Sequence, residues 1–456
     1  MSATAPRRAA FEVLRRVFED DAWADRVLPG ALERNRVSPR ERGLAQRLAY
    51  GSVQRRGSAD HLIERYSKRS IEQLDPPLRA ALRLGVFELL FSDAPAHAAV
   101  DQAVGLAKSA PGGRRGSGLV NAVLRRTAEG GRAALDGLGE DEAATAAVVH
   151  SHPLWLAEMW WRELGRETAL GLMAAGNRPA ETALRANLLR LSAADLIAEL
   201  GEGGVEAIAA PGPAPLDSPE SIVVEGALGS SGASAIEAGR AVGQSRASAA
   251  AVALLDPRPG ESVLDLCAGP GLKSTQIAAR MENLGTVRSI ELRAQRASQV
   301  RRLADRLGAT IVDAIEADAS AVDDPGAGYD RVLVDPPCSD LGTLASRPDA
   351  RWRKRAEDPA RLATLQRSIL ARGAACLRPG GTLVYSTCTI SARENEGLLG
   401  GFLDGEGKRL GVDADHLGER FPALAPAGDP RFLQTRPDRD GTDGFFLARL
   451  HREEVR

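Results

Sequence analysis

Cysteine is scarce in this chain. Four cysteines occur among 456 residues, all in the C-terminal half and without paired CxxC spacing: Cys267, Cys338, Cys376 and Cys388. The six histidines are scattered away from them. A disulfide scaffold or a zinc cluster needs a denser pattern of these residues, so we expect neither, and no metal. The sequence predicts reduced thiols in a cytosolic enzyme.

Long apolar runs are also missing. No run reaches the roughly 18 apolar residues of a membrane-spanning helix, and no cationic start precedes an apolar stretch with a cleavage site. We therefore expect no membrane contact and a cytoplasmic location. The hydrophobic fraction of 43% and the charged fraction of 26% are typical of a soluble globular protein. The length favours two or three domains.

The two signs of charge are unevenly distributed. Residues 1–135 carry 23 Lys and Arg against 15 Asp and Glu, although the whole chain has a net charge of -2. The remainder is therefore acidic. A basic module beside an acidic one is consistent with a polyanionic partner, but a solvated helical surface explains the basic part equally well.

Hydrophobic periodicity predicts three domains. Residues 1–135 have helical spacing, with breaks at turn residues such as Pro29-Gly30, and no strand pattern. Residues 136–245 mix helix and strand, and turns and short strands are expected over 210–234. Residues 246–456 alternate strands (262–266, 286–291, 310–316, 330–334, 381–386) with helices, which indicates a mostly parallel sheet covered on both faces. We expect a late strand at 444–450 to close the edge of this sheet.

A glycine-rich turn follows the first of these strands. Glycines at 269 and 271 allow the backbone to approach a ligand, and the next helix begins with unpaired N–H groups. Glu291, Asp318 and Asp335 end or follow the next three strands. One acidic residue at each strand end is typical of an adenosyl cofactor site. The turn lacks the GxxxxGK[ST] spacing of a triphosphate-binding loop.

Two of the thiols follow strands that end at the same edge of the sheet. Most cysteines are buried as small apolar groups, and that explanation suits Cys376 and Cys267. Cys338 and Cys388 instead lie in polar turns after the strands at 330–334 and 381–386. Such a pair suits methylation of cytosine at carbon 5. A thiolate adds to carbon 6, an acid such as Asp335 stabilises charge near N3, and elimination follows.

These motifs resemble the Nol/Nop/Sun family of RNA cytosine-C5 methyltransferases. The resemblance rests on CAGPGLK (267–273), DPPCS (335–339), STCT (386–389), RPD with Trp352 (347–349), ENE (394–396) and DGFF (443–446). It implies S-adenosylmethionine as methyl donor, Cys388 as nucleophile, and Cys338 as the residue that assists release, with Asp335 as the third catalytic residue. The cofactor-binding residues it implies are Cys267, Ala268, Gly269, Pro270, Gly271, Leu272, Lys273, Glu291, Asp318 and Asp335.

The helical part carries a second resemblance. HAAVDQAV (97–104) and GLVNAVLRR (118–126) are similar to the NusB-type RNA-binding domain that precedes the catalytic domain in the bacterial 16S rRNA methyltransferase B group. The implied architecture is a NusB-like all-α domain (1–135), a small α+β connector that contacts RNA (136–245) and a Rossmann-like methyltransferase domain (246–456). The implied substrate is 16S ribosomal RNA, free or in an assembling small subunit, and we expect a monomer.

The chain departs from the family pattern in three places. Leu272 replaces a glycine of the cofactor loop, Ser245-Arg246 replaces an acidic pair, and Pro336 replaces an alanine.

Alternative functions also remain. Cys338 is the nucleophile if the chain follows DNA cytosine methyltransferases, the substrate could be another RNA, and a non-catalytic RNA-binding factor could retain the fold. Single Cys→Ala variants separate the two thiols.

Overall fold

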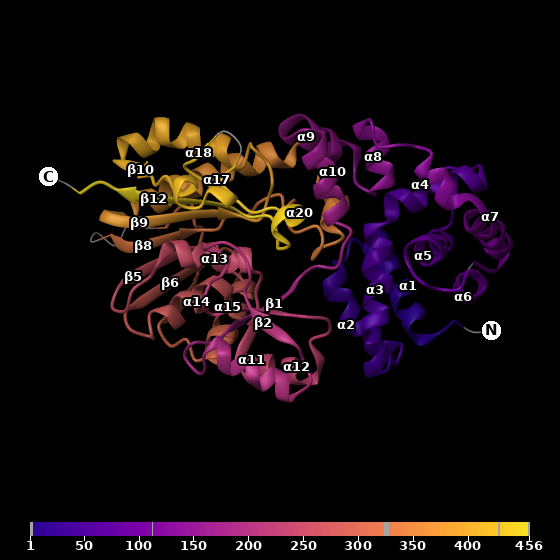
Figure 1. Cartoon of the computed structure of the whole chain (residues 1–456), viewed down its shortest axis with the longest axis horizontal. Helices are drawn as coiled ribbons and strands as arrows, with labels where there is room; N and C mark the ends of the chain where they lie inside the picture. Colours follow the sequence, from indigo (N-terminus) through magenta and orange to yellow (C-terminus); the bar gives the residue numbers. More distant parts are fainter. Residues whose placement is uncertain (1–2, 112, 323–327, 427–428, 455–456) are drawn as a thin grey trace. The chain divides into compact units, whose positions relative to one another are not determined.

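The protein forms two compact units in the computed structural model, which describes residues 3–111, 113–322, 328–426 and 429–454. The first unit comprises Met1–Pro179 and Leu344–Ala356, and the second comprises Ala180–Thr343 and Glu357–Arg456 (Figure 1). A short segment from the second half of the sequence is thus part of the first unit. Across the described ranges, no helix has the length and apolar character needed to span a bilayer.

The first unit is entirely helical in its described part, and it extends beyond residues 1–135, for which an all-helical domain was predicted. Its helices are α1 (Ala5–Glu19), α2 (Ala24–Arg34), α3 (Arg42–Gln54), α4 (Arg56–Ser67), α5 (Pro76–Phe91), α6 (Ala96–Ser109), α7 (Ser117–Asp136), α8 (Ala143–Val149), α9 (Leu154–Leu164), α10 (Arg166–Ala175) and α16 (Ala350–Arg353). Three short 3₁₀ turns connect them, Pro39–Glu41, Ile71–Gln73 and Gly113–Gly116. Helix α1 shows why they form, because its buried Val13, Leu14 and Val17 lie at three- and four-residue spacing.

The break expected at Pro29-Gly30 was wrong. Helix α2 continues through Pro29 to Arg34. Proline removes one backbone hydrogen bond from a helix, but Val27, Leu28 and Ala31 are buried on the same helix. Packing of this apolar face therefore outweighs the local preference for a turn.

The second unit begins with a small antiparallel sheet of order β2-β3-β1-β4. Its elements are β1 (Thr182–Ala186), α11 (Ala193–Glu202), β2 (Ala207–Ala209), β3 (Ser221–Val224), α12 (Gly229–Glu237) and β4 (Ala241–Gly243). The α+β character is as predicted. The expectation of only turns and strands over 210–234 was wrong, because α12 starts at Gly229. Gly232 and Ala235 are buried on one side of α12, so packing of these small residues favours a helix where the sequence pattern favours turns.

A larger sheet follows, of order β10-β12-β9-β8-β5-β6-β7, with β11 paired to β12. Its strands are β5 (Ser262–Leu266), β6 (Thr286–Glu291), β7 (Val312–Glu316), β8 (Tyr329–Val334), β9 (Leu377–Thr387), β10 (Val412–Ala414), β11 (Leu433–Gln434) and β12 (Phe446–Arg452). The helices are α13 (Arg246–Leu255), α14 (Leu272–Arg280), α15 (Ala294–Leu307), α17 (Asp358–Ala375), α18 (Glu396–Phe402), α19 (Leu417–Arg420) and α20 (Pro437–Asp440). A π-helical turn, Leu403–Gly407, extends α18, and a 3₁₀ turn, Pro422–Leu424, follows α19.

Helices cover both faces of this sheet. Strands β5 to β9 are parallel, and their side chains alternate between two cores. Val332 and Val334 pack with α17 and α18, whereas Leu333 packs with α13 and α14. Figure 1 shows these helix pairs on opposite sides of the strands. The predicted Rossmann-like fold is confirmed.

The late strand does not close the sheet. Strand β12 lies between β9 and β10 and runs antiparallel to both, so the described edge on that side is β10. Val412–Ala414 of β10 pairs with Leu450–Arg452 at the far end of β12, so β10 covers the edge that β12 was expected to form. At the centre, β5 lies between β6 and β8, where the strand order reverses. Ligand sites in such sheets lie outside the carboxyl ends of these strands.

Candidate active site

The turn after β5 is shaped for close contact with a ligand. Gly271 has φ +107°, in the left-handed region that favours glycine, and α14 starts at the next residue. A Cβ on Gly269 would lie 2.3 Å from Glu291 Oε2. Only glycine therefore fits at position 269 without displacing the Glu291 carboxylate.

Glu291 is held at the end of β6 by backbone donors. Its Oε2 accepts a hydrogen bond from the Gly269 N–H at 3.2 Å, and its Oε1 accepts one from the Arg293 N–H at 3.1 Å. Asp318, after β7, is exposed and accepts from Ser320 N and Oγ. These hydrogen bonds lower the pKa of Asp318. Both predicted carboxylates thus lie at or just after strand ends.

Asp265 is a carboxylate that sequence reasoning did not assign to the site. It lies on β5, is 1% exposed, and accepts from Ser274 Oγ at 2.5 Å. Its Oδ1 has no partner among the described residues. Burial raises the pKa of Asp265 to about 7. A buried oxygen without a donor fits a ligand that brings one, such as an ammonium group.

Lys273 and Asp335 form a partly buried ion pair. Lys273, on α14, donates from Nζ to Asp335 Oδ2 at 2.6 Å, and Ser386 Oγ donates to Asp335 Oδ1 at 3.0 Å. Burial acts to lower the pKa of Lys273, but the Asp335 carboxylate outweighs it and holds that pKa above its ordinary value. Asp335 is therefore an oriented carboxylate beside a fixed cation.

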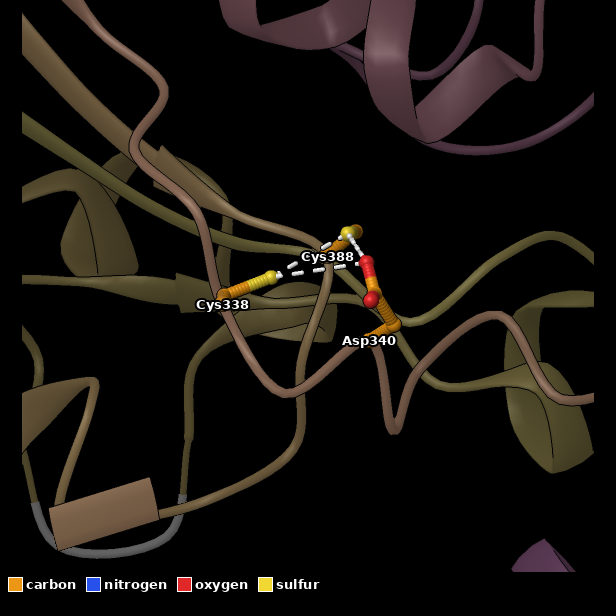
Figure 2. Close-up of side chains that lie close together, drawn as sticks. All are labelled: Cys338, Asp340 and Cys388. Atoms are coloured by element: carbon orange, nitrogen blue, oxygen red, sulfur yellow. Dashed lines mark hydrogen bonds between the residues drawn. The ribbon is translucent and has the colours of Figure 1, made fainter. Parts of the chain in front are cut away.

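The two predicted thiols lie side by side. Cys338 follows β8, Cys388 follows β9, and their Sγ atoms are 3.2 Å apart (Figure 2). The hydrogen bond with Cys338 and burial together raise the pKa of Cys388 well above its ordinary value. Cys388 is thus a neutral thiol in the free protein. A third group, Asp340, accepts a hydrogen bond from Cys388 Sγ at 3.2 Å.

A buried carboxylate joins the two thiol loops. Glu394 is fully buried and accepts from the Ser339 N–H at 2.9 Å and from Gln366 Nε2 at 2.9 Å, as well as from Ser339 Oγ. Ser339 Oγ also lies 2.7 Å from Thr389 Oγ1. The residues next to Cys338 and Cys388 are therefore tied together directly, which explains the short distance between the sulfur atoms.

The RPD-and-tryptophan motif lies elsewhere. It belongs to the segment Leu344–Ala356, which is part of the first unit. Asp349 Oδ2 accepts from the Ala24 N–H at 3.1 Å, and Trp352 Nε1 donates to the Val53 carbonyl at 2.7 Å. These residues hold the segment within the helical unit.

Four further side chains or backbone groups singled out in the sequence have defined surroundings. Cys376 is fully buried at the end of α17. Burial also raises the pKa of the Cys267 thiol. Arg246, one of the departures from the family pattern, is buried and donates to Glu181 Oε2 at 2.6 Å. The Leu272 carbonyl accepts from Arg185 at 3.3 Å.

Comparison with known proteins agrees with the architecture. The NusB family model matches residues 4–129, the RsmF/B-like ferredoxin-like domain matches 152–228, and the 16S rRNA methyltransferase RsmB/F model matches 252–451.

Full-length relatives extend this agreement. A probable ribosomal RNA small subunit methyltransferase B of Bacillus subtilis is 32% identical, covering 99% of this chain and 100% of that protein. The Thermus thermophilus ribosomal RNA small subunit methyltransferase B is 34% identical, covering 99% of both. The crystal structure of PH0851 is 26% identical, covers 98% of both chains and has a TM-score of 0.81.

Proposed function

Because the chain belongs to the RsmB/F family of 16S rRNA methyltransferases, we propose that it methylates carbon 5 of one cytosine in 16S ribosomal RNA. The observation that carries this proposal is the pair of thiols 3.2 Å apart at the ends of β8 and β9, beside the Lys273–Asp335 ion pair. Thiol addition to carbon 6 of a pyrimidine requires a nucleophile and a nearby acid, and this cluster supplies both.

The residues around the glycine turn fit S-adenosylmethionine. When bound, this cofactor supplies an electrophilic methyl group on its sulfonium sulfur. Glu291 is placed to accept hydrogen bonds from ribose hydroxyls, and Asp318 lies at the next strand end. The unpartnered Oδ1 of Asp265 suits the amino group of the methionine part. The remaining contacts come from the loop at 267–273 and from Asp335.

The catalytic roles follow from the positions of three side chains. Cys388 adds through Sγ to carbon 6 of the cytosine, so that carbon 5 becomes nucleophilic. Asp335, with the Lys273 ammonium bound to it, stabilises the charge that develops near N3. Cys338, 3.2 Å from Cys388, assists the elimination in which the carbon 5 proton leaves and the sulfur is released. The target base must leave its stack to expose carbon 6 to the thiol.

The helical unit offers a surface for the RNA backbone. A groove of about 510 Å³ is lined by Arg55, Arg132, Arg178 and His150 around Phe91. The guanidinium carbons of Arg55 and Arg132 lie 4.3 and 5.4 Å from the centre of the Phe91 ring. Burial and the neighbouring Arg132 lower the pKa of Arg55 to about 10. A phosphate would relieve the repulsion between these cations, which supports RNA binding at this groove.

The test is methyl transfer from labelled S-adenosylmethionine to unmodified 16S rRNA, with the product base identified by mass spectrometry. We expect 5-methylcytosine at a single site and its loss in Cys388→Ala. Cys376→Ala removes a thiol outside the site and is the matched control.

Trapping of the covalent RNA adduct distinguishes the two thiols. An adduct that persists in Cys388→Ala and disappears in Cys338→Ala would exchange their roles. Cofactor binding without transfer to any ribosomal RNA would instead favour a non-catalytic RNA-binding protein.

A further inference from the structure

Asp340 is a third reactive group in the thiol cluster. Its Oδ1 lies 3.2 Å from Cys388 Sγ and 4.0 Å from Cys338 Sγ. Figure 2 shows its carboxylate facing both sulfur atoms. The DPPCS motif ends at Ser339, one residue before Asp340, so the resemblance gives this aspartate no role.

The backbone presents Asp340 in an uncommon conformation. Its φ of +58° lies in the left-handed region, which aspartate tolerates better than most residues but which still favours glycine. The carbonyl of Asp340 accepts from Thr343 N and Oγ1 at 3.1 and 3.0 Å. This tight turn directs the carboxylate toward the sulfur atoms instead of away from them.

The same turn is joined to the loop of Cys388. The Gly342 N–H donates to the Cys388 carbonyl at 3.0 Å, and the Leu341 N–H donates to Thr389 Oγ1 at 3.4 Å. A Cβ on Gly342 would lie 1.9 Å from the Gly444 carbonyl oxygen, so a third chain segment packs directly against the turn. The distance between Asp340 and Cys388 is therefore set by backbone contacts on both sides.

Among the described charged groups around Cys388, Asp340 is the carboxylate that accepts a hydrogen bond from its thiol. Asp335 and Lys273 are paired with each other, and Cys338 shares a hydrogen bond with Cys388. Asp340 receives the hydrogen bond from Cys388 itself. Its negative charge also contributes to the raised pKa of that thiol, so Cys388 starts the reaction protonated.

We propose that Asp340 is a catalytic residue that accepts the Cys388 proton during attack on cytosine. The inference rests on the proposed function. As the bond from Sγ to carbon 6 forms, the carbon 5–carbon 6 π electrons move toward carbon 5 and the ring, and the S–H proton moves to Asp340 Oδ1. A sulfur that is forming a new bond loses its proton more readily than a free thiol, so a carboxylate can accept it at this stage.

The proton returns when the product is released. The carbon 5 proton leaves to water beside Cys338, and its bonding electrons restore the carbon 5–carbon 6 double bond. The bond from carbon 6 to Sγ breaks, and the sulfur recovers the proton held by Asp340. The cycle releases one proton in total, the one that the methyl group replaced.

Two variants test the proposal in the full-length protein. Asp340→Asn keeps the shape of the side chain without its basicity, and Asp340→Gly removes the side chain at a position whose φ favours glycine, so folding is retained. In single-turnover methylation of 16S rRNA at neutral pH, both should be slower by about 10²-fold or more, the usual contribution of a general base. Their rates should rise with pH as hydroxide replaces the carboxylate. Asp305→Asn, on the exposed face of α15, should match the wild type.

Alkylation of Cys388 without RNA tells whether Asp340 acts as a base or only positions the Cys388 thiol. Removing the Asp340 charge should lower the pKa of Cys388, so iodoacetamide should modify it faster in Asp340→Asn at neutral pH. Faster alkylation together with slower methylation is the expected pair of results. Methylation by both variants at the wild-type rate and pH profile would overturn the role of Asp340, as would a parallel fall in both reactions. Methylation that survives in Cys388→Ala would remove Cys388 as the nucleophile and with it this role of Asp340, whereas absence of 5-methylcytosine in the wild-type reaction would overturn the proposed function itself.

Discussion

Arg351 donates a hydrogen bond from Nη1 to Asn177 Oδ1 at 2.9 Å, although the two residues are 174 positions apart. The guanidinium is fully buried with no ion-pair partner among the described residues, and burial lowers its pKa to about 9. Its other acceptors are the carbonyls of Ser151, Gly176 and Leu344. One arginine of the catalytic half of the sequence thus completes the hydrogen bonding of the helical unit.

Arg351→Met should therefore destabilise the helical unit. It leaves several buried carbonyl groups without donors, which costs about 1–3 kcal/mol in the free energy of unfolding. Hydrogen exchange at backbone amides of α9 and α10 measures this locally. Arg162→Met, whose arginine side chain is 69% exposed on α9, is the control and should change exchange little. Equal protection in both variants would contradict an anchoring role.

Glu291→Gln should weaken cofactor binding. The substitution keeps the size of the side chain but replaces charge-assisted hydrogen bonds to ribose by weaker ones, so we expect about a tenfold loss of affinity. Calorimetric titration with S-adenosylmethionine measures it. Glu316→Gln changes an exposed carboxylate at the end of β7 and should bind as the wild type does. Unchanged affinity in Glu291→Gln would remove this residue from the cofactor site.

Arg55→Ala and Arg132→Ala should weaken RNA binding and leave cofactor affinity unchanged. If each arginine neutralises one phosphate, each substitution should reduce the slope of log affinity against log salt by about 0.7–0.9. Filter binding of 16S rRNA fragments across a salt series measures the slope. A loss of RNA affinity with an unchanged slope would show that the groove acts through folding and makes no phosphate contact.

Asp265 should make stability depend on pH. Burial raises its pKa from 3.8 to about 7 in the folded state, so folded protein holds a proton that unfolded protein has already lost. The stabilisation that this bound proton gives to the folded state is complete below the unfolded-state pKa of 3.8, and it disappears as the pH rises through about 7. Relative to Asp265→Asn, the free energy of unfolding of the wild type should fall by on the order of 3–4 kcal/mol across that pH interval. Urea unfolding of both proteins at several pH values gives the difference, and parallel curves would contradict it.

Local sequence patterns were sufficient for the elements and for the cofactor loop. The alternation of strand and helix patterns along the chain placed β5, β6 and β8, and glycine spacing identified the turn at 269–271, because both signals depend on neighbouring residues only. The same patterns misjudged Pro29 and the position of β12. Packing of the apolar face of α2 and pairing with β10 decided those two features, and both involve residues distant in the chain.

The sequence by itself determined which groups the protein has for its chemistry: two thiols after strands, acidic residues at strand ends and a basic helical domain. Only the tertiary structure decided how they meet. The 3.2 Å distance between Cys338 and Cys388 depends on Glu394 and on the pairing of β8 with β9, and the place of Asp340 depends on a left-handed turn packed against Gly444. Arg351 and Trp352 likewise belong to the helical unit through contacts with residues far away in sequence. Such contacts result from burial and hydrogen bonding between distant segments, which no local pattern encodes.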